Sequence, residues 1–305
     1  MKILVTGGKG VVGSSLVLEL TARGHDVWVC DLQHSHEKNY FRCDVAKYRP
    51  LLKLFEEHDF DLVYHLAAEF GRWNGEDYYE ELWMSNVVGT KNLLRLQEKF
   101  GFKMVFASSS EVYGDYAGMM AEDVMEKMEI KQMNDYAISK WANELQILNS
   151  QIMHGNQVVR VRIFNTYGPG EYYSPYRSAI CLFIYRALQN LPCTVYLNHK
   201  RTSLYIDDCI TALSNIVDNF KAGEVYNIAG SELHDMKSVS DMILTYLNKD
   251  DSHIEYQEEE PFTTKIKIPD ISKTIRDLNY SPRVILEQGI PRTVEWTKEV
   301  YNLQD

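Results

Sequence analysis

Residues 3–13, ILVTGGKGVVG, decide the fold. The apolar run at residues 3–6 is typical of a strand buried on both faces, and a leucine-containing helical pattern follows Gly13. Gly7, Gly10 and Gly13 stand between them with GxxGxxG spacing. Glycine permits a tight turn there and lets a pyrophosphate approach the backbone at the start of the helix. This order of strand, glycine turn and helix predicts a Rossmann-like α/β fold that binds a dinucleotide.

An acidic residue follows the second predicted strand. Asp31 lies 18 residues after Gly13, close to the spacing expected for a carboxylate that accepts a hydrogen bond from the adenosine ribose. A carboxylate there favours NAD over NADP, because a 2′-phosphate would meet like charge. Small or apolar residues after the later strands let a cofactor lie close. The residues expected to bind NAD from this pattern are Gly7, Gly10, Val11, Val12, Gly13, Asp31, Asp44, Val45, Leu66, Ala67 and Ala68.

Strands and helices alternate through the first half of the chain, which predicts a doubly wound parallel sheet. The alternation breaks after Gly170, where we expect a smaller α/β substrate-binding lobe to begin. The predicted domains are a Rossmann domain of residues 1–168, to which residues 206–230 return, and a lobe made of residues 169–205 and 231–305. A loop at residues 69–81 leaves the carboxyl end of a strand, where ligands bind in such sheets.

Composition narrows the class of protein. The 305 residues are 45% hydrophobic and 25% charged, as in an ordinary globular protein. A net charge of −11 argues against binding to nucleic acid or to an anionic membrane. The five cysteines form no CxxC and are expected to be reduced, buried thiols without a metal, and no stretch of 18 apolar residues exists for a membrane span. These features predict a soluble, cytoplasmic protein.

Tyr136 and Lys140 are four residues apart on a predicted helix, so their side chains project from one face. A phenol titrates near 10 and is a poor base at neutral pH, but a nearby positive charge favours the phenolate. Lowering that pKa to about 7 requires roughly 4 kcal/mol. One lysine together with a positively charged cofactor ring could supply this, which makes the pair a candidate catalytic base.

Six motifs carry a resemblance to a known family. In order they are TGGKGVVG, HLAAE, NVVGT, SSSEVYG, YAISK and RIFNTYGPG, and the match to the family that they begin runs from Met1 to about Trp296. The chain resembles the extended short-chain dehydrogenase/reductase superfamily. Within it, the chain is most similar to the NAD-dependent nucleotide-sugar epimerases, dehydratases and decarboxylases.

The resemblance implies roles for individual residues. Ser109 would share the hydrogen bond of the substrate hydroxyl with Tyr136, and Lys140 would hold the nicotinamide ribose and depress the pKa of Tyr136. Asn86 and Phe164 would contact or support the cofactor, and Asn165 would contact substrate. Arg201 would contact the nucleotide diphosphate. Lys267 stands where relatives carry arginine, so its contact with the diphosphate is expected to be that of a point charge.

The shared chemistry implied by the resemblance is oxidation of a sugar hydroxyl, usually at carbon 4, by Tyr136 and NAD. The resulting ketone acidifies the neighbouring carbon or allows a carboxyl group beta to it to leave. Ser110 and Glu111 then distinguish the reactions, because a carboxylate at position 111 would take the carbon 5 proton in a 4,6-dehydratase. A decarboxylase needs a cation for the substrate carboxylate, for which Arg72 and Arg177 are candidates, and Glu69 is a further candidate substrate contact.

We therefore predict a nucleotide-sugar 4,6-dehydratase, with a 4-epimerase as the first alternative and a glucuronate decarboxylase as the second. A keto-sugar reductase and an NAD sensor without catalysis remain open. Helices 86–100 and 134–151 carry more apolar positions than one core-facing stripe needs. This surplus predicts a homodimer through a helix bundle, and its members are Val87, Leu93, Ile138, Trp141, Leu145 and Leu148.

Overall fold

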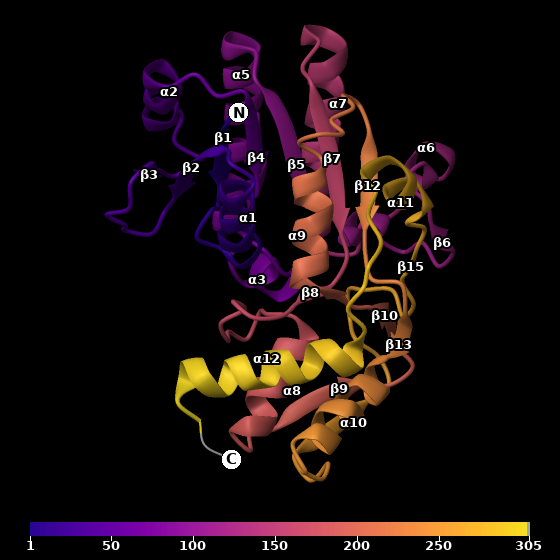
Figure 1. Cartoon of the computed structure of the whole chain (residues 1–305). Coiled ribbons are helices and arrows are strands. Elements are labelled where there is room, and N and C mark those ends of the chain that lie inside the picture. The colour runs from indigo at the N-terminus through magenta and orange to yellow at the C-terminus, as the bar shows by residue number, and fades with distance from the viewer. Residues whose placement is uncertain (304–305) are drawn as a thin grey trace.

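The computed structural model describes residues 1–303 and contains one sheet of seven parallel strands (Figure 1). The order across the sheet is β12-β7-β5-β4-β1-β2-β3. The bounds of these strands, in chain order, are β1 Lys2–Thr6, β2 Asp26–Asp31, β3 Tyr40–Arg42, β4 Leu62–His65, β5 Lys103–Ser109, β7 Val158–Ile163 and β12 Val225–Ile228. A parallel sheet covered by helices confirms the predicted Rossmann-like class.

Helices cover both faces of this sheet because successive strand residues point to opposite sides. Ile3 and Val5 of β1 pack into one hydrophobic cluster and Leu4 into another. The first cluster contains α1 (Val11–Ala22) and α9 (Ile206–Asn215), which lie side by side in Figure 1. The second contains α2 (Tyr48–Glu57), α5 (Gly89–Phe100) and α7 (Asp135–His154).

A smaller lobe lies beyond the carboxyl ends of the sheet strands (Figure 1). It holds α8 (Ala179–Leu188), α10 (Met236–Tyr246) and α12 (Leu286–Tyr301), with β9 (Cys193–Tyr196) parallel to β14 (Ile254–Gln257) and β10 (Lys200–Thr202) antiparallel to β13 (Leu233–Asp235). The remaining short elements are β6 Met119–Met120, α6 Val124–Lys127, β8 Thr166–Tyr167, β11 Leu204–Tyr205, β15 Ile268–Pro269 and α11 Ser272–Leu278, of which α6 and α11 lie beside the sheet near β12 (Figure 1). We propose the domain division given above, and the pairing of β12 with β7 supports it.

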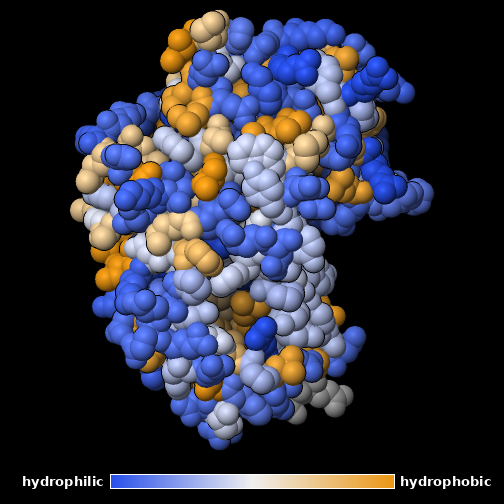
Figure 2. Space-filling view, turned by 180° about the vertical axis from the view of Figure 1, so that it is seen from behind, coloured by the Kyte–Doolittle hydropathy of each residue, from blue (hydrophilic) through white to orange (hydrophobic). Residues whose placement is uncertain are grey.

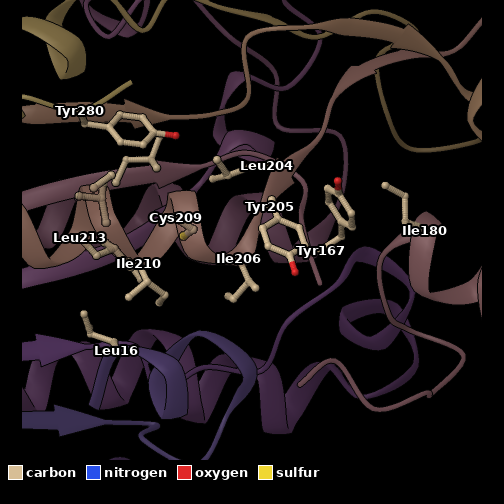
Figure 3. Close-up of a cluster of buried hydrophobic side chains, with 14 of the residues drawn as sticks. Leu16, Tyr167, Ile180, Leu204, Tyr205, Ile206, Cys209, Ile210, Leu213 and Tyr280 are labelled. Carbon is tan, nitrogen blue, oxygen red and sulfur yellow. The ribbon is translucent and has the colours of Figure 1, made fainter. Parts of the chain in front are cut away.

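The core is continuous between the sheet and the lobe. Figure 3 shows Leu16 of α1 facing Ile206 and Ile210 of α9, with Ile180 of α8 at the other end of the same cluster. Because apolar side chains from both parts share this cluster, the lobe is anchored by hydrophobic packing as well as by chain connections.

The segment expected to be a loop, residues 69–81, is partly helical. Gly71, at φ +90°, precedes α3 (Arg72–Asp77), which is followed by α4 (Tyr79–Trp83) and the π-helix η1 (Met84–Val88). Gly75 packs so closely on the start of α7 that an added Cβ would lie 3.3 Å from the backbone N of Tyr136. Helices this short leave no readable apolar period in a sequence.

The five cysteines are free and buried, as the sequence predicts. Within residues 1–303, no helix combines the length and apolar character needed to cross a membrane. Nor does this described part contain a group of three His, Cys, Asp or Glu side chains that could hold a metal ion.

Candidate active site

A cavity of about 750 Å³ lies between the carboxyl ends of the sheet strands and the smaller lobe. Figure 2, which views the molecule from behind, shows a mostly hydrophilic face that is hollowed near its middle. Most residues singled out from the sequence line this cavity. They are Gly7, Gly10, Val11, Val12, Gly13, Asp31, Asp44, Val45, Leu66, Ala67, Ala68, Glu69, Arg72, Ser109, Ser110, Glu111, Tyr136, Lys140, Asn165, Arg177 and Arg201.

The glycine turn forms one end of the cavity. The Gly10 backbone N–H donates to the Gly7 carbonyl, and a Cβ at Gly13 would lie 2.1 Å from that same oxygen. Asp31 accepts from the backbone N–H of Lys9 at 2.9 Å, which holds its carboxylate beside the turn. Close backbone at a helix N-terminus with a carboxylate beside it is the donor and acceptor set that a dinucleotide requires, so the residues present fit NAD.

The other end of the cavity holds Tyr136 and Lys140, which project from the same face of α7. Lys140 Nζ lies 5.8 Å from the centre of the Tyr136 ring and donates to the carbonyl of Ala107 at 2.8 Å. The Tyr136 hydroxyl is hydrogen-bonded to the side chain of Ser109. The three residues implied by the resemblance to act together are therefore adjacent.

Burial governs the pKa values of this pair. Burial is the main cause that raises the pKa of Tyr136 to about 12. The hydrogen bond with Ser109 lowers this pKa, and the negative charge of Glu111 raises it further. Burial also lowers the pKa of Lys140 to about 8, against the pull of Glu144. The expected depression of the Tyr136 pKa is thus not supplied by protein groups alone, and the positive charge of a bound nicotinamide ring would favour the phenolate.

A buried ion network holds α7 against the sheet. Glu144, one turn after Lys140, accepts from Arg162 at 2.8 and 3.0 Å and from Arg160 at 3.1 Å, and from the Ser108 hydroxyl at 2.6 Å. Both arginines belong to β7, and Ser108 immediately precedes Ser109 in β5. The network therefore fixes the helix that carries Tyr136 relative to the strand that carries its hydrogen-bond partner.

Glu111 lies in the 3₁₀-helix η2 (Ser110–Tyr113), directly after β5. Its carboxylate pairs with Lys267, which is buried, and it feels the charges of Arg72 and Arg201. Burial raises the pKa of Glu111, but these three cations outweigh it and bring the pKa to about 2. Glu111 is consequently an anion throughout the neutral range and a weak base.

Arg72 is paired with Glu260 and also donates to the carbonyl of Pro261 at 3.2 Å. Glu260 lines the cavity and lies 3.9 Å from Arg201 as well. From sequence, residues 258–260 resemble a solvated acidic turn. That interpretation is wrong for Glu260, because its partners come from positions far away in the chain.

Three predicted residues lie outside the cavity wall. Lys267 stands behind it, in contact with Glu111. Asn86 is buried and bonds the backbone of Glu69 and the hydroxyl of Ser139, so it holds the loop and α7 together. Phe164 is fully buried in a small core cluster with Tyr113.

The remaining candidates have defined partners. Arg177 lies over the ring of Phe70, with 4.3 Å between guanidinium and ring centre, and so joins the lobe to the loop after β4. Asn165, at φ +32°, donates to the carbonyl of Thr202 at 3.1 Å. Arg201 donates to the carbonyls of Thr264 and Lys265, both at 2.7 Å, and thus supports residues 263–265. Asn134 was not among the residues predicted from the sequence. Its position directly before a predicted helix is the one feature of the sequence that could have identified it.

Fold and site together define a Rossmann-like enzyme with a tyrosine–lysine–serine centre. The sequence profile of the "NAD dependent epimerase/dehydratase family" matches residues 3–229. The chain belongs to this family, and its cofactor is NAD.

Individual relatives differ in their reactions. The chain is 31% identical to a UDP-N-acetyl-alpha-D-glucosaminuronate decarboxylase of Bacillus cytotoxicus, over 99% of each chain. It is 28% identical to a dTDP-glucose 4,6-dehydratase of Salmonella typhimurium, over 97% of this chain and 92% of the relative. Among solved structures, a UDP-glucuronic acid 4-epimerase from Bacillus cereus with UDP-glucuronic acid and NAD has a TM-score of 0.88, at 27% identity, over 99% and 100% of the two chains. These relatives define a class of nucleotide-sugar enzymes.

Proposed function

We propose that this protein oxidises a nucleotide-linked hexuronate at carbon 4 and then decarboxylates it. The observation that carries the proposal is the charge cluster around Glu111. Arg72, Arg201 and Lys267 provide three positive charges against the two carboxylates Glu111 and Glu260, which leaves one excess positive charge in this cluster. An excess cation in a partly buried site favours an anionic group of the substrate.

The residues of the chain would act as follows. Tyr136 takes the proton from the sugar hydroxyl as it is oxidised, and Ser109 shares the hydrogen bond of that oxygen. Lys140 keeps a positive charge near the phenol, which favours the phenolate. NAD, when bound, accepts the hydride from the sugar and later returns it. Arg72, which lines the cavity, orients the substrate carboxylate. The bond from carbon 5 to the carboxyl group breaks, carbon dioxide leaves, and the electrons form an enolate with the ketone, which then takes up a proton at carbon 5.

The charge state of Glu111 supports decarboxylation over dehydration. Removing the carbon 5 proton calls for a base with a pKa near the working pH, whereas Glu111 has a pKa of about 2 and is paired with Lys267. Loss of carbon dioxide needs no such base. The similarity to a glucosaminuronate decarboxylase over almost the whole chain supports the same choice.

A nucleotide-sugar 4,6-dehydratase is the second candidate. It is favoured by the closeness of Glu111 to Tyr136, which is sufficient to raise the pKa of the phenol. In that reaction the substrate would have to separate Glu111 from Lys267 so that the carboxylate could act as base. Ser110, buried next to Glu111, would then be the neighbour of the leaving hydroxyl.

Mass spectrometry of products tests the proposal. Purified protein is incubated with UDP-, dTDP-, GDP- and CDP-linked hexoses and hexuronates. We expect a product lighter by one carbon dioxide from a hexuronate, and none from Tyr136→Phe. Loss of one water from a hexose would replace the proposal with the dehydratase, and an isomer of unchanged mass would replace it with a 4-epimerase. Release of oxidised cofactor with a reduced sugar would indicate a reductase.

We also propose a cytoplasmic homodimer. The free cysteines support the location, and the exposure of Ile138 and Leu145 on α7 and of Met84 on η1 supports the association. Leu93, which we had counted among the surplus apolar positions, is instead fully buried in the core. Light scattering that gives a monomer at micromolar concentration would contradict the dimer.

A further inference from the structure

Residues 258–267, called the strap from here on, run between the smaller lobe and the catalytic helix. On the lobe side, Arg201 donates to the carbonyls of Thr264 and Lys265, and the backbone N–H of Lys267 donates to the carbonyl of Lys200 at 3.1 Å. The backbone N–H of Glu260 donates to His199 Nε2 at 3.3 Å. The strap is therefore fixed to the lobe by its backbone.

The other side of the strap contacts elements of the Rossmann part. Glu260 pairs with Arg72, the ring of Phe262 lies 5.7 Å from that of Trp73, and Lys267 pairs with Glu111. Each partner belongs to a segment that lines the cavity or lies next to the residues that do. The strap is thus in contact with elements of the Rossmann part that line the cavity.

Asn134 provides the direct connection between the strap and α7. Its side-chain Oδ1 accepts from the backbone N–H of Ala137 at 2.8 Å and so caps the helix. Its Nδ2 donates to the carbonyl of Phe262 at 3.1 Å and, at the longer distance of 3.5 Å, to Glu111 Oε2. The side chain is buried, and Tyr136 is only two residues further along.

The geometry at Phe262 indicates that this contact is specifically maintained. Phe262 has φ +60°, a left-handed conformation that costs free energy for a residue with a Cβ. Such a conformation persists where surrounding contacts impose it. The bond from Asn134 and the ring contact with Trp73 are the contacts of Phe262 that the structure defines toward the Rossmann part.

Of the residues that cap helices well, Asn alone can both accept from the helix and donate to the strap. Ser and Asp cap helices as well as Asn does, because each offers an oxygen acceptor. Neither can also donate to the Phe262 carbonyl. An ionised Asp has no donor, and the hydroxyl of Ser is too short to cap the helix and reach that carbonyl at the same time. Asn carries an acceptor and two donors on one planar group.

We infer that Asn134 is a positioning residue, which aligns α7 with the strap so that Tyr136 meets the substrate held by the lobe. The inference rests on the proposed oxidation by Tyr136 and does not depend on what happens to the ketone afterwards. It applies equally to decarboxylation, dehydration and epimerisation.

The test compares Asn134→Ser, which keeps a cap and loses the donor, with Asn134→Ala, which loses both. Asp235→Ser is the matched control, because Asp235 caps α10 by accepting from the Lys237 N–H at 2.9 Å and, unlike its neighbour Met236, does not itself line the cavity. For Asn134→Ser we expect a Tm close to that of the wild type. Its kcat should fall by roughly ten- to a hundredfold, the loss typical of a misplaced catalytic group, with a much smaller change in KM. Asn134→Ala should lower Tm as well, and Asp235→Ser should leave kcat unchanged.

Hydrogen exchange of the strap supplies a readout that needs no turnover. Amides of residues 262–266 should exchange faster in Asn134→Ser than in the wild type, and as slowly as in the wild type in Asp235→Ser. Unchanged exchange together with unchanged kcat would overturn the inference. Equal losses of Tm in Asn134→Ser and Asn134→Ala would do so too, because they would reduce Asn134 to a helix cap. If the wild type turns over no nucleotide sugar, the proposed function fails and the exchange comparison alone decides on Asn134.

Discussion

At the scale of single residues, the site contains a pair of side chains that the sequence identifies. It also contains ion pairs that form only because the fold brings distant residues together. Tyr136 and Lys140 are predictable because helical spacing alone puts them on one face. The pairing of Glu260 with Arg72 and of Lys267 with Glu111 is not predictable, because the partners are 188 and 156 residues apart in the chain. Local periodicity contains no information about such pairs. The same limit explains why burial, which raises the pKa of Tyr136, could not be anticipated.

Tyr136→Phe should abolish most turnover while leaving the fold intact. The phenol oxygen is the proposed proton acceptor, and general-base catalysis typically contributes about 10²–10⁴-fold to a rate. Its bond to Ser109 is the one hydrogen bond of that hydroxyl that the structure of residues 1–303 defines, so Tm should change little. Product formation followed by mass spectrometry, with thermal unfolding as the control, checks this. A variant with wild-type kcat would exclude Tyr136 as the base.

At the scale of elements, the glycine turn is the part that sequence predicts best. Its spacing, the strand before it and the helix after it all favour the same structure, and β1 and α1 lie where expected. Helices α3 and α4 show the opposite case, since each is too short for an apolar period to develop. Their position is set by packing, as the close approach of Gly75 to α7 illustrates.

Gly13→Ala should damage both stability and cofactor binding. The new Cβ would lie 2.1 Å from the Gly7 carbonyl oxygen, so the turn must move. We expect the free energy of unfolding to fall by at least about 1–3 kcal/mol, the usual cost of overpacking, and NAD to bind much more weakly. At Gly10 the nearest atom to an added Cβ is 3.3 Å away, so Gly10→Ala should cost clearly less. Denaturant unfolding and titration with NAD provide the comparison, and equal losses in the two variants would refute it.

At the scale of the whole molecule, the two parts are joined by charge as well as by apolar packing. Lys267 and Glu111 form an ion pair between them, and burial lowers the pKa of Lys267 to about 8 while Glu111 opposes this. The sequence supports the existence of the smaller lobe, because the alternation of strands and helices stops. It contains no signal for how the lobe meets the sheet.

Stability should therefore fall in acid through Glu111. Its pKa is about 2 in the folded protein and 4.5 in its ordinary state, so the unfolded chain binds more protons between these values. The stabilisation is present above about pH 4.5 and is lost as the pH falls towards 2, and the shift corresponds to about 3 kcal/mol. Urea unfolding between these pH values should show this extra loss in the wild type.

The double variant Glu111→Gln with Lys267→Met should lack that part of the acid loss, and it avoids leaving one buried charge alone. The exposed pair Lys237–Asp241 is the control, since removing it should alter the pH dependence by less than about 1 kcal/mol. Equal pH dependence in the wild type and the double variant would contradict the prediction.

The position of β12 has a consequence for synthesis of the chain. β12 completes the sheet beside β7, yet it follows a long segment that belongs to the smaller lobe. Once residues 1–170 have left the ribosome, all strands of the sheet except β12 have been synthesised. Strand β7 is then an edge strand with unpaired backbone groups between apolar side chains. Such an edge readily pairs with strands of other molecules. Nascent chains are therefore most prone to aggregate in this interval, and a fragment that stops before residue 225 would keep that sticky edge permanently.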